Sequence, residues 1–375
     1  MAEVVRVVHA LDTISMLGGG VAEAVRGLCL ALVAKGADVR VVAGRDVRSE
    51  EDLPRWAGVP VTLVEPRGKI DALTGASFAA AVRAAAPELL HIHGVWGPAS
   101  RASVRLLAEA IVVLSPHGMF DAWAMRRSRI KKRLSAWVWE RHLLRHARLF
   151  HALCVPEVDS IRAIHARAAI VTIPNGVTLP KLDSAPDVDA TRATLLFLGR
   201  LHPKKGVGEL IAGWALLPPT LRASWRLVIA GWDELGLLQD LAAQAETLGV
   251  AGEMHFPGPV LGAAKDALFR SAAAFILPSY SEGLPLSVLE AWSYALPVFI
   301  TEACNLPIGF ERNAAFRVTT APGEIAAALA ARLSDPAALA AAGYAGRKLA
   351  ERDYSWESVA EAMLTAYAEL RFTKS

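Results

Sequence analysis

Hydrophobic and polar positions alternate between two patterns along the chain. Short β-branched runs such as "VVRVVHAL" (4–11) and "DVRVVAG" (38–44) predict strands. Between them, "VAEAVRGLCLALVAKG" (21–36) has apolar positions at helical spacing and ends in a glycine. Strand, glycine turn, helix and strand in this order are typical of a parallel sheet covered by helices.

The same order recurs through both halves of the chain. Further strand-like runs lie at 88–94, 110–118, 147–154, 169–176, 193–200, 225–231, 273–279 and 297–301. Residues 177–193 are rich in Pro and Asp and lack periodicity, which predicts a linker. We therefore predict an α/β fold with two doubly wound domains, 1–180 and 190–354. A C-terminal helix, 355–375, is expected to pack back on the N-terminal domain.

Composition narrows the class of protein. The 375 residues are 53% apolar and 21% charged, and no apolar tract reaches 18 residues, so we expect no membrane span. The apolar run at the start of the chain is too short, and is followed too soon by polar residues, for a secretory signal. A net charge of +3 does not favour a nucleic-acid partner. The three cysteines have no paired spacing, which predicts neither disulfides nor a zinc site and favours the cytoplasm.

The basic residues are unevenly distributed. Residues 1–180 hold 23 Lys/Arg against 16 Asp/Glu, and residues 123–150 hold nine against one. One interpretation of this segment is a core-packed helix with a solvated basic face. The other is contact with anionic lipid headgroups or a lipid-diphosphate acceptor. The candidate contact residues are Arg126, Arg127, Arg129, Lys131, Lys132 and Arg133.

Two glutamates, Glu282 and Glu290, stand in "SEGLPLSVLEAW" after an apolar strand. The carboxyl ends of parallel strands are where open sheets bind ligands. A helix starting in this stretch would present backbone N–H groups to an anion, which makes its first residues donor-binding candidates. These are Gly283, Leu284, Pro285 and Leu286. Alternatively, Glu282 is an N-terminal helix charge and Glu290 an exposed helical residue.

Two further strand ends of the second half carry candidates. Arg200 and Lys205 in "FLGRLHPKKG" follow a strand, where a guanidinium and an ammonium can reach phosphate oxygens. They could equally be solvated loop residues. Gly231 ends the next strand in "IAG".

The first half offers glycines and histidines at strand ends. Gly19 and Gly20 allow close approach of a phosphate, or simply form a tight turn. His117 in "SPHG" and Asn175 in "PNG" each end a strand, and Asn175 fits a turn without any ligand. His91 and His93 share a strand face, but no third ligand stands at a convincing spacing, so we expect no metal.

Several motifs in the same order resemble glycosyltransferase family 4, the retaining GT-B enzymes. "GR....K", "IAG" and "PSYSEGLPLSVLE" are similar to its sugar-nucleotide half, and "GGG", "HIHGVWGP", "SPHGMFDAWAMRRSRIKKR" and "IPNGV" continue the resemblance upstream. It implies two Rossmann-like domains facing across a cleft that holds a nucleotide diphosphate sugar. By this resemblance Arg200 and Lys205 hold the diphosphate. Glu290 accepts from the ribose, Glu282 faces the donor sugar, and His117 lies beside its anomeric region.

The resemblance also implies a reaction. The sugar would be transferred to a hydroxyl of a lipid-linked or oligosaccharide acceptor in bacterial surface polysaccharide synthesis. The anomeric configuration would be retained by front-face attack, and the reaction would need no metal and no cofactor. The expected location is the cytoplasm, with a peripheral position on the inner face of the membrane. Overall resemblance favours GDP-mannose over a UDP-sugar, although "CNLPIGF" (304–310) departs from the family's glycine-rich turn and leaves the base open. The alternatives are a sugar-nucleotide epimerase of the same fold and a non-catalytic nucleotide-sugar-binding protein.

Overall fold

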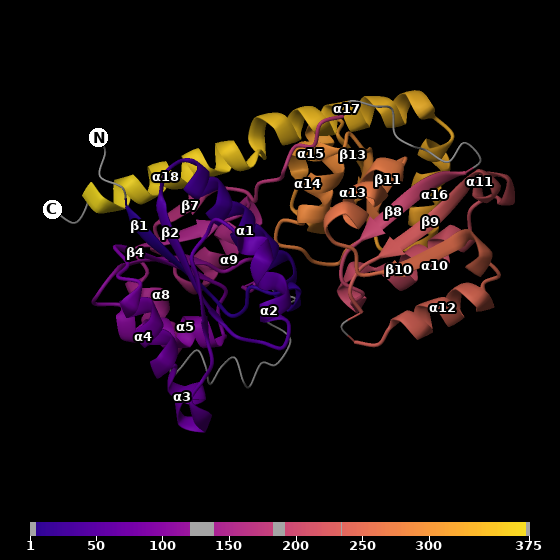
Figure 1. Ribbon diagram of the computed structural model, residues 1–375. Helices are drawn as coiled ribbons and strands as arrows, with labels where there is room; N and C mark the ends of the chain where they lie inside the picture. The colour runs from indigo at the N-terminus through magenta and orange to yellow at the C-terminus, as the bar shows by residue number, and fades with distance from the viewer. Residues whose placement is uncertain (1–4, 121–138, 183–191, 234, 373–375) are drawn as a thin grey trace. The chain divides into compact units, whose positions relative to one another are not determined.

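The computed structural model describes residues 5–120, 139–182, 192–233 and 235–372 (Figure 1). The chain forms two compact units, and the first unit is discontinuous in sequence. Unit 1 comprises Met1–Gly176 and Trp356–Ser375, and unit 2 comprises Val177–Ser355. The six basic candidates between Arg126 and Arg133, and the linker residues 183–191, lie outside the described residues.

Unit 1 is built on a parallel sheet with the strand order β3-β2-β1-β4-β5-β6-β7. Its strands are β1 (Arg6–Leu11), β2 (Asp38–Gly44), β3 (Val61–Val64), β4 (Leu89–His93), β5 (Ile111–Ser115), β6 (Leu149–Ala152) and β7 (Ile170–Thr172). In β1 and β4, His9 pairs with His91 in register. The reversal of strand order between β1 and β4 is the switch point at which such sheets bind ligands.

Helices cover both faces of this sheet (Figure 1). One face packs against α4 (Ala76–Ala84), α5 (Pro98–Ser103), α8 (Arg141–His146) and α9 (Val155–Ile164). The other packs against α1 (Gly19–Ala34) and α18 (Trp356–Phe372). Short helices α2 (Ser49–Asp52) and α3 (Gly68–Thr74), with 3-10 turns at Met16–Gly18, Leu53–Trp56 and Val104–Leu106, complete the described part of the unit.

The last helix, α18, is an integral part of unit 1. Its Met363 and Tyr367 are buried in the core beneath the sheet. Its first residue, Trp356, lies against two glycines: a Cβ at Gly27 would come within 2.1 Å of the indole, and one at Gly176 within 2.3 Å. The glycines therefore leave the space that the indole fills.

Unit 2 is a parallel sheet with the order β10-β9-β8-β11-β12-β13. Its strands are β8 (Ala193–Leu198), β9 (Trp225–Ala230), β10 (Met254–Gly258), β11 (Ala274–Leu277), β12 (Val298–Ile300) and β13 (Ala315–Arg317). Its helices are α10 (Val207–Ala215), α11 (Pro219–Ser224), α12 (Leu238–Thr247), α13 (Gly262–Ser271), α14 (Leu286–Ser293), α15 (Pro307–Glu311), α16 (Pro322–Leu333) and α17 (Pro336–Asp353). Three 3-10 turns lie at Pro203–Lys205, Ala251–Glu253 and Glu302–Cys304.

The α/β class predicted from the sequence is confirmed by the two helix-covered parallel sheets. Three strands were not recognised from the sequence: β3, β10 and β13. Each is short and stands at or near a sheet edge, where a continuous apolar run is not needed. The cysteines Cys29, Cys154 and Cys304 are buried, and they form no disulfide within the described part of the chain.

One segment, Met16–Ala34, is long and apolar enough to cross a membrane by length and composition, and the bent pair α16 and α17 passes the same test together. In the structure, the apolar side chains of α1 have a local explanation. Val25, Leu28 and Leu32 are buried in the core between the sheet and α18.

Candidate functional site

In unit 2, the loops after β8 and β11 bring Lys205 and Glu282 together. Lys205 ends the 3-10 turn after β8, and its Nζ donates to Glu282 Oε1 at 2.5 Å. Ser279, just after β11, donates its hydroxyl to the same oxygen at 2.6 Å. The side chains of the ion pair are only 12% and 7% exposed. The sequence did not identify Ser279, whose hydrogen bond helps to fix the position of the carboxylate.

The charges around Glu282 determine its protonation. Burial would raise its pKa, but the Lys205 and Lys204 charges and two hydrogen bonds hold the pKa below the ordinary value. The carboxylate is therefore ionised near neutral pH and can accept hydrogen bonds from hydroxyl groups.

Asn305 holds the backbone on which Glu282 stands. It has a left-handed conformation at φ 58°, and its Nδ2 donates to the carbonyl oxygens of Glu282 at 2.7 Å and Gly283 at 2.8 Å. In addition, the Glu282 N–H donates to the carbonyl oxygen of Ala303. The sequence assigned Asn305 no such role, because its clamp on this loop depends on tertiary structure.

Helix α14 begins at Leu286 rather than at Gly283, and this corrects the expected row of helical amides. Pro285 is its N-cap and has no N–H to donate. Glu290 follows about one turn into the helix and accepts from Lys265 Nζ of α13 at 2.5 Å. The two glutamates thus have separate lysine partners. Lys265 was not recognised from the sequence.

The other two candidates of unit 2 lie at the ends of β8 and β9. Arg200 follows β8 and is partly buried. Gly231 has a structural explanation: a Cβ there would lie 1.7 Å from the carbonyl oxygen of Gly199, and its N–H already donates to Gly258. The close approach of the two strand ends requires a glycine at this position.

In unit 1, the glycine loop before α1 is held by acidic residues from the region 45–70. Asp46 accepts from the hydroxyls of Thr13 and Ser15, and Asp52 accepts from the Met16 N–H at 2.7 Å. Gly19 is the first helical residue and has φ 56°. A Cβ at Gly20 would meet nothing within 4 Å, so its surface is open to a ligand.

Two carboxylates, Asp12 and the buried Glu140, shape the loop after β4 in the "HIHGVWGP" stretch. Asp12 accepts from the Ala99 N–H at 2.8 Å, and Glu140 accepts from the Trp96 N–H at 2.6 Å and the Ser100 hydroxyl at 2.7 Å. Burial raises the pKa of the Glu140 carboxyl group, and desolvation of the carboxyl group also raises the pKa of Asp12. These acids give the motif a structural role at the carboxyl edge of the sheet.

His117 and Asn175 line the same small pocket of unit 1. The pocket holds about 250 Å³ of empty space, including its part open to solvent, and His93, His151 and Trp356 also line it. His117 is half-buried with φ 53°, a strained conformation for a residue other than glycine. The pocket has a polar histidine wall on the sheet side and an apolar wall on the helix side.

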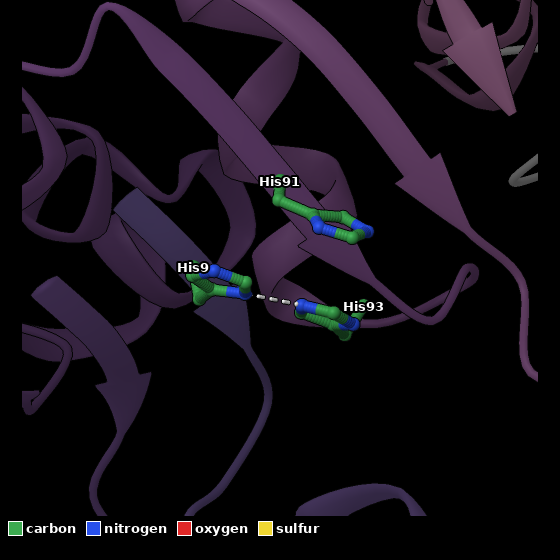
Figure 2. A group of neighbouring side chains, drawn as sticks. All are labelled: His9, His91 and His93. Atoms are coloured by element: carbon green, nitrogen blue, oxygen red, sulfur yellow. Dashed lines mark hydrogen bonds between the residues drawn. The ribbon is translucent and has the colours of Figure 1, made fainter. Parts of the chain in front are cut away.

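Behind the pocket, three histidines come together (Figure 2). His9 on β1 joins His91 and His93 on β4, and candidate ligand atoms of the three lie within 4.8 Å of one another. His9 is the third histidine of the group, and sequence spacing did not reveal it because strand register brings it alongside His91. All three are buried, and burial is the main cause that lowers their pKa values, to about 3 for His9.

The hydrogen bonds of His91 determine whether this group fits a metal. Its Nδ1 pairs with the Tyr367 hydroxyl and its Nε2 with the Ser115 hydroxyl, each at 2.6 Å. A cation would have to break one of these bonds, and His9 Nδ1 already pairs with His93 Nε2 at 2.8 Å. The side chains therefore form a hydrogen-bonded network that does not fit a preformed metal site.

Comparison with known proteins identifies the family. Residues 180–349 match the family described as glycosyl transferases group 1, and residues 19–176 match the glycosyl transferase 4-like domain. The class defined by the two sheets is that of the two-domain GT-B glycosyltransferases. The chain belongs to the group 1, family 4 glycosyltransferases, as the sequence motifs predicted.

Individual relatives are more distant. The D-inositol 3-phosphate glycosyltransferase of Actinosynnema mirum is 28% identical over 247 residues, which are 57% of this chain and 56% of the relative. The O-antigen chain mannosyltransferase B of Escherichia coli is 30% identical over 113 residues, 30% of this chain and 29% of the relative. The chain thus spans about half or less of the curated relatives it matches. Anabaena HepE, solved with UDP and glucose, has the same fold with a TM-score of 0.80, at 17% identity over 97% of this chain and 100% of that one.

Proposed function

We propose that the protein transfers a sugar from a nucleotide diphosphate sugar to an acceptor hydroxyl. The observation that carries the proposal is the buried Lys205–Glu282 pair at the carboxyl edge of the unit 2 sheet, with Ser279 and Asn305 holding it in place. An ammonium and an ionised carboxylate side by side suit a ligand that carries both phosphate and hydroxyl groups. A nucleotide sugar is such a ligand.

Each residue of unit 2 has a chemical part in this proposal. Lys205, with Arg200 on the same loop, stabilises the charge that develops on the departing diphosphate. Glu282 accepts hydrogen bonds from the donor sugar, and Glu290 accepts them from the ribose. When the donor binds, Lys205 exchanges part of its interaction with Glu282 for the phosphate. The part of His117 at the donor sugar stays a prediction from the resemblance.

The stereochemical outcome and the absence of metal are part of the proposal. The diphosphate leaves on the side from which the acceptor hydroxyl enters, and a phosphate oxygen takes the hydroxyl proton. The bond from the anomeric carbon to the phosphate oxygen breaks as the bond to the acceptor oxygen forms. Lys205 and Arg200 supply positive charge to this leaving group, so we propose that the reaction needs neither a resident metal nor a cofactor.

We propose two classes of donor and three classes of acceptor to be tested. GDP-mannose is our preferred donor from the resemblance, with a UDP-sugar next. The solved HepE with UDP and glucose supports testing UDP-sugars with equal weight. For the acceptor we propose a lipid-linked or oligosaccharide hydroxyl, in the cytoplasm and at the inner face of the membrane. The inositol-phosphate glycosyltransferase relatives favour adding a phosphorylated polyol to the acceptors tested.

The first experiment is a thermal melt with UDP, GDP and ADP and their sugar conjugates in the presence of EDTA. A ligand that binds the folded state raises its stability by about 2.7 kcal/mol at a hundredfold excess over Kd. We expect stabilisation by one base, reduced in Glu290→Ala and retained in Glu246→Ala, which changes an exposed acid of α12 in the same unit. No stabilisation by any nucleotide would contradict the proposal.

Activity and stereochemistry follow with the preferred donor. We expect transfer to an acceptor hydroxyl with the anomeric configuration of the donor, read by NMR of the product. Inversion would contradict the front-face mechanism. Interconversion of the nucleotide sugar with no acceptor would identify an epimerase. Binding with neither reaction would identify a non-catalytic binding protein.

A further inference from the structure

His117 is linked to the core of unit 1 by a chain of two hydrogen bonds. His117 Nε2 lies 3.0 Å from His93 Nδ1, and His93 Nε2 lies 2.8 Å from His9 Nδ1. Figure 2 shows the second of these bonds between neighbouring strands. His9 Nε2, at the inner end, is buried and has no hydrogen-bond partner among the residues that the structure describes. At the outer end, the described residues offer His117 Nδ1 no hydrogen bond, and its ring lines the pocket.

Proton counting makes these three rings behave as one unit. A neutral imidazole has one N–H and one bare nitrogen, and each nitrogen-to-nitrogen bond needs one donor and one acceptor. If His117 donates from Nε2, His93 accepts at Nδ1 and must donate from Nε2, so His9 accepts at Nδ1 and carries its own proton on Nε2. The reverse choice reverses all three rings. Only two arrangements are possible: every ring protonated on Nε2, or every ring protonated on Nδ1.

The three rings are neutral at ordinary pH, which this counting requires. Burial is the main cause that lowers the pKa of each ring, to about 3 for His9 and His117. The other titratable groups facing the chain are His91, His151 and Tyr367, and they are also held neutral by burial. No acidic side chain among the described residues hydrogen-bonds to His9, His93 or His117.

We propose that His93 and His9 are positioning residues that determine which nitrogen of His117 carries the proton. The tautomer of His9 therefore decides whether the outward Nδ1 of His117 donates or accepts a hydrogen bond. His9 acts on His117 through the two hydrogen bonds of the chain. A neutral hydroxyl group suits this nitrogen in either state, because it can donate or accept. The identity of that hydroxyl, as part of the donor sugar, rests on the proposed function.

A second chain in the same core provides an internal reference. The carbonyl oxygen of Ile173 can only accept, so His151 must donate to it from Nε2, at 2.8 Å. Ser115 then donates to His151 Nδ1 and accepts from His91 Nε2, and Tyr367 donates to His91 Nδ1. His91 and His151 therefore both carry their proton on Nε2, because the Ile173 carbonyl oxygen fixes the direction of every hydrogen bond in this chain.

The test is nitrogen NMR on the full chain labelled with 15N, without ligand and near neutral pH. Long-range proton–nitrogen spectra identify the protonated nitrogen of each ring, and a coupling between ring nitrogens reports each N–H···N bond. We expect one common tautomer for His9, His93 and His117, with couplings across both bonds, and Nε2–H for His91 and His151. A mixed set of tautomers in the chain of three, or absent couplings, would overturn the proposal.

A variant tests the positioning role. His93→Phe keeps a ring of similar size and removes both hydrogen bonds. We expect the His117 nitrogen shifts to move toward the average of the two tautomers, and kcat/KM to fall about fivefold. The matched control is His142→Phe, which changes an exposed histidine of α8. Unchanged nitrogen shifts at His117 would show that His93 does not determine which nitrogen of His117 carries the proton. The free-protein spectra need no activity, so they decide this proposal even if glycosyl transfer is not observed.

Discussion

The Lys205 ammonium lies 2.5 Å from the Glu282 carboxylate, although 77 residues separate the two in sequence. Each charge is nearly buried, so each is needed to offset the other. The contact keeps the Glu282 carboxylate ionised and holds both side chains in place. The effect of Lys205 on stability can therefore be measured separately from its effect on turnover, by changing Lys205 alone and together with Glu282.

Lys205→Met should lower both quantities. Leaving the Glu282 charge buried and unpaired costs about 3–5 kcal/mol of unfolding free energy, and removing the phosphate partner lowers kcat by about 10²- to 10³-fold. Adding Glu282→Gln should restore most of the stability and none of the turnover. Chemical denaturation and steady-state kinetics measure the two effects. The control Lys348→Met changes an exposed lysine and should alter neither. Full activity in Lys205→Met would remove this residue from the site.

Glu290→Gln should weaken donor binding more than turnover. The amide keeps the size of the side chain but loses the charge that pairs with Lys265 and accepts from ribose hydroxyls. We expect the donor Kd to rise about tenfold, measured by calorimetry, with a smaller effect for the 2′-deoxy nucleotide than for the ribonucleotide. Equal losses for both nucleotides would place Glu290 away from the ribose.

Asn305→Gly isolates the clamp from the backbone conformation. Glycine accepts the left-handed φ of 58° but cannot donate to the carbonyl oxygens of Glu282 and Gly283. Two lost hydrogen bonds should lower the unfolding free energy by about 1–3 kcal/mol. The matched control is Asn313→Gly, also left-handed at φ 55°, which should stay within about 0.5 kcal/mol. Equal effects in the two variants would refute the clamp.

Gly27→Ala should destabilise unit 1. The added methyl group would lie 2.1 Å from the Trp356 ring, so the indole or α1 must move. Overpacking of this kind costs about 1–3 kcal/mol. In Gly323→Ala, the new methyl group meets nothing within 4 Å, and stability should be retained or slightly raised. Thermal unfolding of the two variants compares them. A neutral Gly27→Ala would show that Trp356 does not occupy this space in solution.

The buried histidines predict acid unfolding of unit 1. In the unfolded chain their pKa is about 6.5. In the folded unit, burial lowers the pKa of His9 to about 3 and of His151 to about 4, and keeps His91 and His93 well below the ordinary value. Below pH 6.5 the unfolded chain therefore binds more protons. Stability is complete above that pH and falls as pH falls, approaching about 5 kcal/mol per pH unit for four groups.

Hydrogen exchange at a series of pH values checks this expectation. Backbone amides of β1 and β4 should lose protection between about pH 6 and pH 5, before those of β8 and β11. Equal loss of protection in the two sheets would show that the histidines are not buried and neutral. The pair Glu282 and Lys205 belongs to the other unit, where the lowered pKa of Glu282 maintains stability until a lower pH.

The sequence predicted most strands and the α/β class because buried parallel strands are continuous apolar runs. It did not predict the convergence of His9 with His91 and His93. The alternation "HIH" placed two rings on one face, but the third ring, His9, lies 84 positions before His93 on a strand whose register no local pattern specifies. A single histidine inside the apolar run 4–11 was the available signal.

The site of unit 2 shows the same division. Lys205, Glu282 and Glu290 could be selected because each follows a strand or continues its helix. Lys265 and Asn305 could not, because their contacts depend on how α13 and the loop after β12 pack against α14. The helix start was also misplaced by three residues, since "GLP" resembles a helical first turn while Pro285 in fact serves as the cap.

The inclusion of α18 in unit 1 has a consequence for biosynthesis. The sheet of unit 1 is made first, yet Trp356, Met363 and Tyr367, which cover one of its faces, are made only after the whole of unit 2. Until then His91 lacks its hydroxyl donor and an apolar surface stays uncovered, while unit 2 is contiguous and can fold at once. The first half of the chain must therefore wait until α18 has been made, and this interval is when the nascent protein most needs a chaperone.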